Sequence, residues 1–183
     1  MEKKDFNTAN IRKGSITTRD LVQVGLLIAL VFISTRFINI RLPISINGGL
    51  IHLGNCMLFT IAIVFGKHKG ALAGAFGMAL FDIFSSWVIW APFTFIIRGA
   101  MGYIIGSIAN NSQRKGDDML INVLAIGIAG IVMIFGYYIT EVILYGNLYA
   151  PITSVPGNVV QIVIGMILGI PLSKVLIRYK KYF

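Results

Sequence analysis

Long apolar runs alternate with short polar segments along the chain, and this pattern predicts six helices. Each run holds about 17 to 25 residues, the length that an α-helix needs to cross a hydrocarbon core of about 30 Å. We therefore expect an all-α fold, a polytopic membrane protein whose single domain, residues 1–183, is a six-transmembrane-helix bundle. The predicted spans are about residues 21–38, 50–66, 70–86, 91–109, 119–145 and 158–177.

Local signals mark the start of the first helix and the linker that follows it. Thr17 or Thr18 can cap the helix, and Asp20 then falls in its first turn, where an acidic residue is favourable. Pro43 favours an extended backbone in the linker of residues 39–49, which ends in an Asn-Gly-Gly turn. This linker is predicted to lie outside the membrane spans.

Residues 70–106 form the most unusual stretch, an apolar helical hairpin that carries one charge of each sign. Pro92 suits the first turn of a helix, so the aromatic corner at residues 87–91 separates two helices. Asp82 precedes this corner and Arg98 follows it. Ionisable residues within membrane spans are costly and mark functional positions by default. The two residues form either a structural ion pair across the hairpin or part of a binding site.

Composition and charge agree with a membrane protein. Hydrophobic residues make up 56% of the chain and charged residues 13%, whereas a soluble domain has roughly a quarter charged residues. Of the 16 Lys and Arg residues, 13 lie in the two terminal segments, in the turn at residues 67–69 or in the loop at residues 114–115. A six-span bundle places these four segments on the same face of the membrane. The positive-inside rule makes that face, and both termini, cytoplasmic. Orientation and lipid contact explain the formal charge of +9, and no nucleic acid partner is expected.

Pairs of small residues one helical turn apart are typical of helices that pack closely in lipid. The pair Gly25 and Ala29, on the first helix, can either pack within the bundle or offer a surface to another protein. Four further pairs are expected to pack inside the bundle: Gly70 and Gly74, Ala73 and Gly77, Gly102 and Gly106, and Gly165 and Gly169.

Polar and aromatic residues fall into helical stripes in the outer halves of the predicted spans, which suggests a pocket open to the outside. One stripe on the second span holds His52, Asn55 and Phe59, and one on the fifth holds Tyr138, Glu141 and Tyr145. Structural alternatives are helix-to-helix hydrogen bonds and an aromatic belt at the membrane surface. The candidate substrate-binding residues are Asn47, His52, Asn55, Asp82, Trp87, Trp90, Thr94, Arg98, Tyr138, Glu141, Tyr145, Asn158 and Gln161.

Sequence motifs of catalysis are missing, so we expect a protein that is not an enzyme and needs no cofactor or metal. The chain has no phosphate-binding Gly-x-x-x-x-Gly-Lys-Ser/Thr loop and no His-Glu-x-x-His pair. One alternative is a stand-alone proton-coupled secondary transporter that uses Asp82 or Glu141 as its proton site. Another is an intramembrane enzyme, which would need a catalytic set that the sequence does not reveal.

Three sequence blocks resemble a known family over essentially the whole chain. They are HLGN at residues 52–55, GALAGAFG at 70–77 leading to Asp82, and APFTFIIRG at 91–99. Together with the small pair on the first helix and the long first linker, they resemble the substrate-binding S components of energy-coupling factor (ECF) vitamin transporters. The second and third blocks are similar to the riboflavin-type and hydroxymethylpyrimidine/pyridoxine-type subgroups.

The resemblance implies a function in the cell membrane of a prokaryote. Such proteins capture a vitamin at the outer face and associate with a transmembrane coupling (T) protein and two ATPases. Ala29 matches the second residue of the family's Ala-x-x-x-Ala docking motif, Gly25 departs from the first, and residues 39–49 would act as a lid. Asp82 and Glu141 near Arg98 favour a neutral or cationic heteroaromatic vitamin, such as pyridoxine, hydroxymethylpyrimidine or riboflavin. An anionic vitamin would need Arg98 or Arg41 free of an acidic partner.

Overall fold

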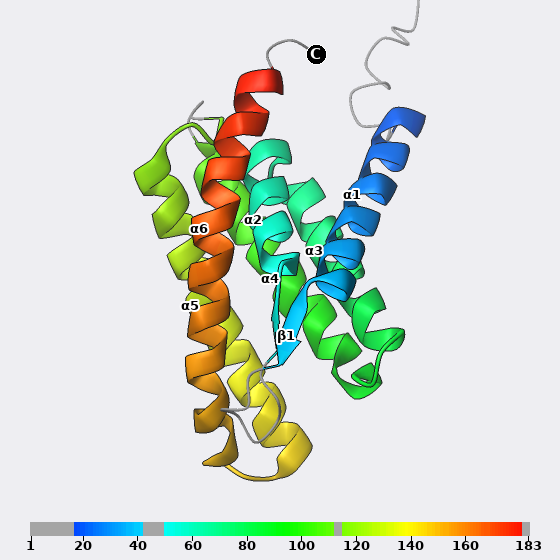
Figure 1. Ribbon diagram of the computed structural model, residues 1–183, viewed down its shortest axis with the longest axis vertical. Helices are drawn as coiled ribbons and strands as arrows, with labels where there is room; N and C mark the ends of the chain where they lie inside the picture. Colours follow the sequence, from blue (N-terminus) through cyan, green and yellow to red (C-terminus); the bar gives the residue numbers. More distant parts are fainter. Residues whose placement is uncertain (1–16, 42–49, 112–114, 181–183) are drawn as a thin grey trace, which may run out of the picture.

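The computed structural model describes residues 17–41, 50–111 and 115–180, which form an up-and-down bundle of α-helices (Figure 1). The helices are α1 (Thr18–Phe37), α2 (Gly54–Phe65), α3 (Lys67–Ile83), α4 (Ala91–Ala109), α5 (Met119–Tyr145) and α6 (Val155–Lys180), with short 3₁₀ helices η2 (Val88–Trp90) and η4 (Ala150–Ser154). Strands β1 (Asn39–Arg41) and β2 (Leu50–His52) form a small antiparallel ribbon. The described chain begins and ends at the same end of the bundle (Figure 1). The prediction of six helices is confirmed.

The prediction that the second helix begins at residue 50 is wrong. Residues 50–52 form β2, which pairs with β1 so that Asn39 lies opposite His52, and α2 begins only at Gly54. A short apolar run does not distinguish a strand from a helix, and here the pairing with β1 decides. α2 has 12 residues, so it is about 18 Å long at 1.5 Å per residue. It is almost wholly buried and contacts α1, α3, α4 and α6.

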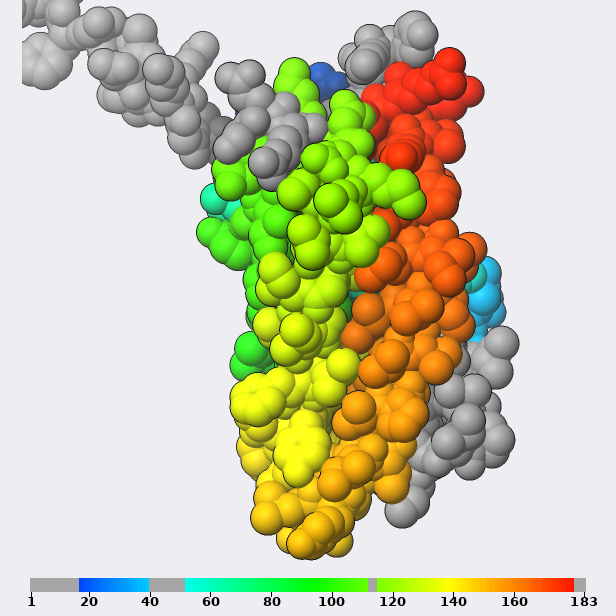
Figure 2. Space-filling model, turned by 90° about the vertical axis from the view of Figure 1, so that its left-hand side faces the viewer, coloured from blue at the N-terminus to red at the C-terminus, as the bar shows by residue number. Residues whose placement is uncertain are grey.

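Four segments of the described chain are long and apolar enough to cross a membrane. They are Thr18–Phe37, Val88–Ala109, Met119–Tyr145 and Ala150–Tyr179. α3 has 17 residues and begins at Lys67, so the basic turn that we placed outside the third span is the first turn of this helix. α5 and α6 lie side by side on one face (Figure 2). Their exposed large apolar side chains include Leu124, Ile128, Ile131, Phe135, Ile167 and Leu168, as expected for contact with lipid.

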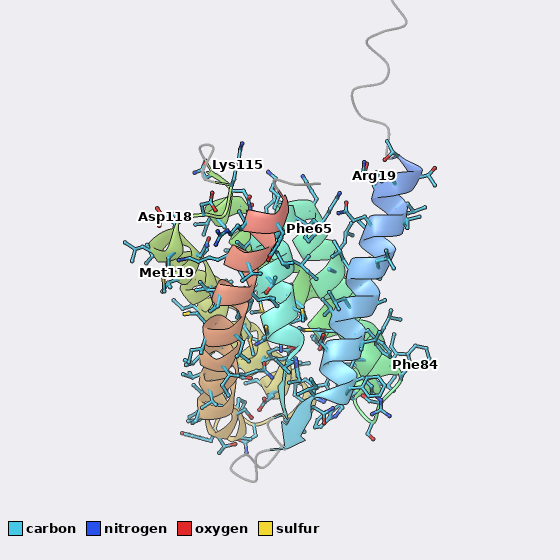
Figure 3. The ribbon with its side chains drawn as sticks, turned by 45° about the horizontal axis from the view of Figure 1, so that its top comes forward. Arg19, Phe65, Phe84, Lys115, Asp118 and Met119 are labelled. Atoms are coloured by element: carbon cyan, nitrogen blue, oxygen red, sulfur yellow. The ribbon has the colours of Figure 1, made fainter. Side chains whose placement is uncertain are left out.

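Charged side chains gather at the end of the bundle where the described chain begins and ends. Arg19, Lys115 and Asp118 lie there, whereas Phe84 lies beyond the last turn of α3 at the opposite end (Figure 3). Asp118 caps α5, because its Oδ1 accepts from the backbone N–H of Leu120 at 3.0 Å and of Ile121 at 3.2 Å.

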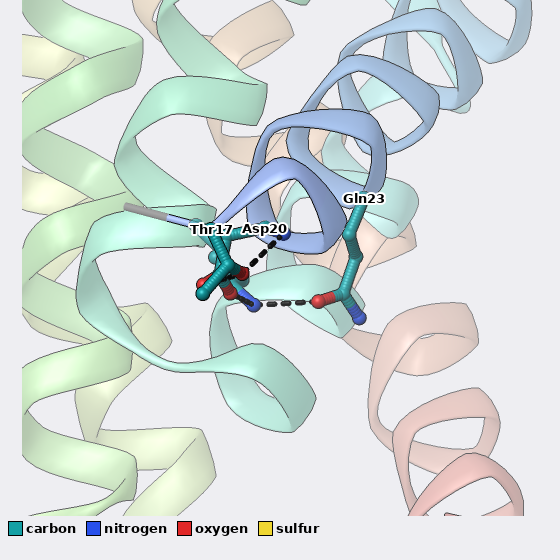
Figure 4. A network of polar contacts seen from close by, with 4 residues as sticks. Thr17, Asp20 and Gln23 are labelled. Atoms are coloured by element: carbon teal, nitrogen blue, oxygen red, sulfur yellow. Dashed lines mark hydrogen bonds and ion pairs between the residues drawn. The ribbon is translucent and has the colours of Figure 1, made fainter. Parts of the chain in front are cut away.

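Polar contacts fasten the first turn of α1 to α3 (Figure 4). Thr17 is the N-cap, as predicted, and its hydroxyl accepts from the backbone N–H of Asp20 at 3.1 Å. Lys69 forms an ion pair with Asp20 at 2.9 Å and donates to Gln23 Oε1 at 2.5 Å. These contacts lie at the exposed surface, so they orient α1 more than they stabilise the fold.

Small residues bring α3 and α4 into backbone contact. A Cβ atom added to Gly102 would overlap the carbonyl of Gly70, and one added to Gly74 would lie 2.8 Å from the carbonyl oxygen of Arg98. The pair Gly165 and Gly169 likewise packs against α2. The expectation that these pairs pack within the bundle is confirmed. The face of α1 with Gly25 and Ala29 differs, because both residues are exposed and a Cβ on Gly25 would meet nothing within 4 Å.

We expect Gly102→Ala to lower the free energy of unfolding by about 1–3 kcal/mol, because the backbone of Gly70 cannot move away. Thermal unfolding in detergent measures the change. The matched control is Gly127→Ala on α5, where a Cβ would meet nothing within 4 Å. Equal melting temperatures for the two variants would contradict the close packing.

Candidate binding site

Arg98 lies on α4 and is 3% exposed. Its Nε donates to the Tyr137 hydroxyl at 3.1 Å. Its Nη1 donates to Asn55 Oδ1 at 2.6 Å, and its Nη2 donates to Gln161 Oε1 at 3.1 Å. The acceptors belong to α5, α2 and α6, so one guanidinium connects four helices. We call Asn55, Arg98, Tyr137 and Gln161 the Arg98 cluster.

The amide side chains of Asn55 and Gln161 also bond to each other within the cluster. Asn55 is fully buried and donates from Nδ2 to Gln161 Oε1 at 3.2 Å, while its own oxygen accepts from Arg98. The Met133 sulfur lies 3.2 Å from Arg98 Nη1. Since Gln161 Oε1 accepts from both neighbours, these three side chains satisfy one another in a setting without bulk water.

The predicted alternative of an ion pair between Asp82 and Arg98 is wrong. Asp82 and Arg98 interact electrostatically, but the ion pair found among the described residues joins Lys69 to Asp20. Instead of pairing with a carboxylate, Arg98 donates hydrogen bonds to two neutral amides and a phenol. The guanidinium fork explains this choice, because its N–H groups point in different directions and need acceptors on several helices.

Aromatic rings lie at the corner between α3 and α4, next to the cluster. The Trp90 ring centroid lies 6.2 Å from those of Trp87, Tyr137 and Tyr145. The Tyr137 ring also lies 5.1 Å from Arg98 Cζ, a cation–π distance. Tyr137 therefore belongs both to the Arg98 cluster and to this aromatic group of Trp87, Trp90, Tyr137 and Tyr145. Trp87 and Trp90 are half-buried, and Tyr145 is exposed.

Sequence reasoning missed Tyr137 and chose its neighbour Tyr138. The Tyr137 hydroxyl lies 3.2 Å from that of Thr94, whereas the Tyr138 hydroxyl donates to the carbonyl of Leu148 at 2.8 Å. Met133, Tyr137 and Glu141 follow one another at four-residue spacing, which is as good a helical stripe as the one that contains Tyr138. The periodicity alone could not decide between the two.

Glu141 is 4% exposed and lies one turn beyond Tyr137 on α5. Its Oε2 accepts from the Ser154 hydroxyl at 2.9 Å, which ties the end of α5 to η4. Asn158 is half-buried in the first turn of α6, one turn before Gln161. Asn47 and residues 42–49 of the predicted lid lie outside the described residues.

Asp82 and His52 are buried near the C-terminal end of α3. Asp82 is 8% exposed; Thr94 is a hydrogen-bonding neighbour of its carboxylate, but Asp82 Oδ2 has no partner among the described residues. His52 is 9% exposed and ends β2, so its predicted place on a helical face with Asn55 is wrong. Its ring centroid lies 6.4 Å from that of Phe81. His52 Nδ1 also has no partner within the described chain.

Comparison with known proteins identifies the family. The sequence model of the ECF-type riboflavin transporter S component matches residues 15–178. This chain belongs to that S component family. The match covers α1 to α5, all but the last two residues of α6, and both residue groups described above, so the resemblance drawn from the three sequence blocks is confirmed.

Two relatives of this S component are informative. One is the "Thiamine precursor transporter HmpT" of Lactococcus lactis subsp. cremoris (strain MG1363), 28% identical over 175 residues, which cover 96% of this chain and 93% of the relative. The other is an "Uncharacterized protein in gap 3'region" of Pyrococcus woesei, 35% identical over 130 residues, which cover 71% of this chain and 84% of the relative. The S component is thus a membrane protein of a transporter family.

We expect Arg98→Lys to lower the free energy of unfolding by about 1–3 kcal/mol, because an ammonium group cannot reach three acceptors in the directions of the guanidinium fork. Thermal unfolding of the purified protein in detergent measures the loss. Arg178→Lys, at an exposed position near the end of α6, is the matched control and should melt like the wild type. A variant at position 98 that also melts like the wild type would refute the structural role of the cluster.

Proposed function

We propose that this S component binds a heteroaromatic B vitamin or vitamin precursor at the outer face of the cell membrane. It delivers this substrate with a transmembrane coupling (T) protein and two ATPase subunits, and its own termini face the cytoplasm. The observation that carries the proposal is the family match over residues 15–178. The name of the lactococcal relative, a thiamine precursor transporter, supports a small heteroaromatic substrate such as hydroxymethylpyrimidine, with pyridoxine and riboflavin as the other candidates.

The arrangement of side chains supports a site for such a ring. The aromatic group offers flat apolar faces at the end of the bundle opposite the described chain ends. Polar side chains lie next to it: the Thr94 hydroxyl is 3.2 Å from that of Tyr137, and Thr94 is also a neighbour of the Asp82 carboxylate, so a ring stacked on the aromatic group can have its polar edge satisfied. Positive charge at the opposite end favours the orientation in which this site faces outward.

The exposed face of α1 supports a docking role. α1 lies at the edge of the bundle (Figure 1). Its residues Leu27 and Val31 are buried against the rest of the bundle. Gly25 and Ala29 lie on the outer side, where no side chain of the described chain covers them. Small residues of this kind let a helix of another protein approach closely in lipid.

Binding at the aromatic group should change tryptophan fluorescence, because both tryptophans of the chain belong to that group. Purified protein is titrated with hydroxymethylpyrimidine, pyridoxine and riboflavin, by calorimetry and by fluorescence. We expect at least one compound to bind and to shift or quench the emission. For riboflavin, whose own absorption quenches tryptophan, the control is free tryptophan at the same absorbance. Calorimetric binding without a change in emission would argue against this location.

Gly25→Leu combined with Ala29→Leu should leave vitamin binding unchanged and abolish ATP-dependent uptake into vesicles that contain the coupling protein and both ATPases. The bulky side chains block close helix approach without touching the site. Gly127→Leu, on an open position of α5, is the matched control and should transport normally. Uptake by this chain alone that collapses with the proton gradient would instead favour a proton-coupled carrier.

A further inference from the structure

Four buried side-chain atoms of the described residues have no hydrogen-bond partner. They are His52 Nδ1, Asp82 Oδ2, Ser107 Oγ and Asn122 Oδ1. A buried polar atom without a partner destabilises a protein, so each one calls for an explanation. Ser107 and Asn122 belong to the end of α4 and the start of α5, at the charged end of the bundle. His52 and Asp82 lie at the other end, near the aromatic group.

Asp82 lies on one face of α3, and His52 of β2 reaches the same face. Met78 and Asp82 are four residues apart, one helical turn, so they lie on the same face. His52 Nδ1 would lie 2.7 Å, and Met78 Cε 3.0 Å, from a Cβ atom added to Gly54. The absence of a side chain at Gly54 therefore lets the imidazole reach this face. The His52 ring also lies 6.4 Å from the ring of Phe81, the residue that precedes Asp82 on α3.

The Arg98 cluster does not share this lack of partners. Each nitrogen of the Arg98 guanidinium already donates to an acceptor on another helix. Asn55 uses both its oxygen and its nitrogen within the cluster. A ligand that bonded to Arg98 would have to replace one of these interactions, whereas a ligand that bonded to Asp82 Oδ2 or His52 Nδ1 would satisfy an atom that is now unpaired. Recognition by Asp82 and His52 is therefore the energetically favourable arrangement.

We propose that Asp82 and His52 recognise the substrate, and that the Arg98 cluster only positions the helices around them. This inference rests on the proposed function and names the chemistry of its substrate. A carboxylate only accepts hydrogen bonds, so the group opposite Asp82 is a donor: an amino, hydroxymethyl or ring N–H group of a neutral or cationic heteroaromatic ring. A substrate with a carboxylate or phosphate at that position is rejected by charge repulsion.

The test compares Asp82→Ala with Ser107→Ala. Both substitutions remove a buried atom that has no partner, but only the first lies near the aromatic group. We expect Asp82→Ala to bind hydroxymethylpyrimidine, pyridoxine or riboflavin, whichever the wild type binds, at least about tenfold more weakly, as is typical for a hydrogen bond to a charged group. His52→Leu should weaken binding as well, and Ser107→Ala should bind like the wild type.

A second measurement uses the wild-type protein and does not depend on the folding of any variant. The compound that binds is compared with analogues in which one donor at a time is removed or methylated, such as 4-deoxypyridoxine for pyridoxine or 3-methylriboflavin for riboflavin. One such change should weaken binding to the wild type about tenfold, because the donor that faces Asp82 is lost.

The outcomes separate the two proposals. If the wild type binds none of the three compounds, the proposed function fails and this inference fails with it. If the wild type binds but every donor-blocked analogue binds equally well, the recognition role of Asp82 is overturned and the proposed function stands. Asp82→Ala and His52→Leu variants that are folded and bind like the wild type overturn the inference in the same way.

Discussion

A buried guanidinium needs an acceptor for each of its nitrogens, and this requirement organises the bundle around Arg98. The acceptors come from α2, α5 and α6, so these helices must reach α4 at one level. Glycines make the approach possible. A Cβ atom at position 165 would lie 2.8 Å from the Cβ of Asn55, and one at position 74 would lie 2.8 Å from the Arg98 carbonyl oxygen. The close packing of α6 on α2 and of α3 on α4 thus occurs next to residues of the Arg98 cluster.

The central place of α2 follows from this constraint. Its 12 residues are too few to cross a membrane alone, yet it is the most completely buried helix of the described chain. Other helices of the protein surround it, so lipid does not have to match its length. Because α2 begins only at Gly54, the residues before it pair as the ribbon of β1 and β2, which brings His52 beside Phe81 near the C-terminal end of α3.

Local features of this fold could be predicted from the sequence, and contacts between distant residues could not. The cap at Thr17, the helix start near Pro92 and the inward packing of Gly102 and Gly165 depend on neighbouring residues or on a one-turn spacing. The strand at residues 50–52 depends on pairing with a distant segment. Opposite charge suggested that Arg98 pairs with Asp82, but the directions of its N–H groups favour amides and a phenol. Tyr137 was missed because its helical stripe competes with that of Tyr138.

α1 connects the proposed docking face to the proposed recognition residues. Its outer side carries the exposed Gly25, while its inner side packs on α3, where Val31 lies against Gly77. One turn farther along α1, Thr35 meets Gly54 beside the His52 ring, and its hydroxyl is held within α1 by a 2.7 Å bond to the Val31 carbonyl. A shift of α1 would therefore move Thr35 against the residues next to His52. The contacts from Val31 through Thr35 to Gly54 thus connect α1 by direct packing to the surroundings of His52.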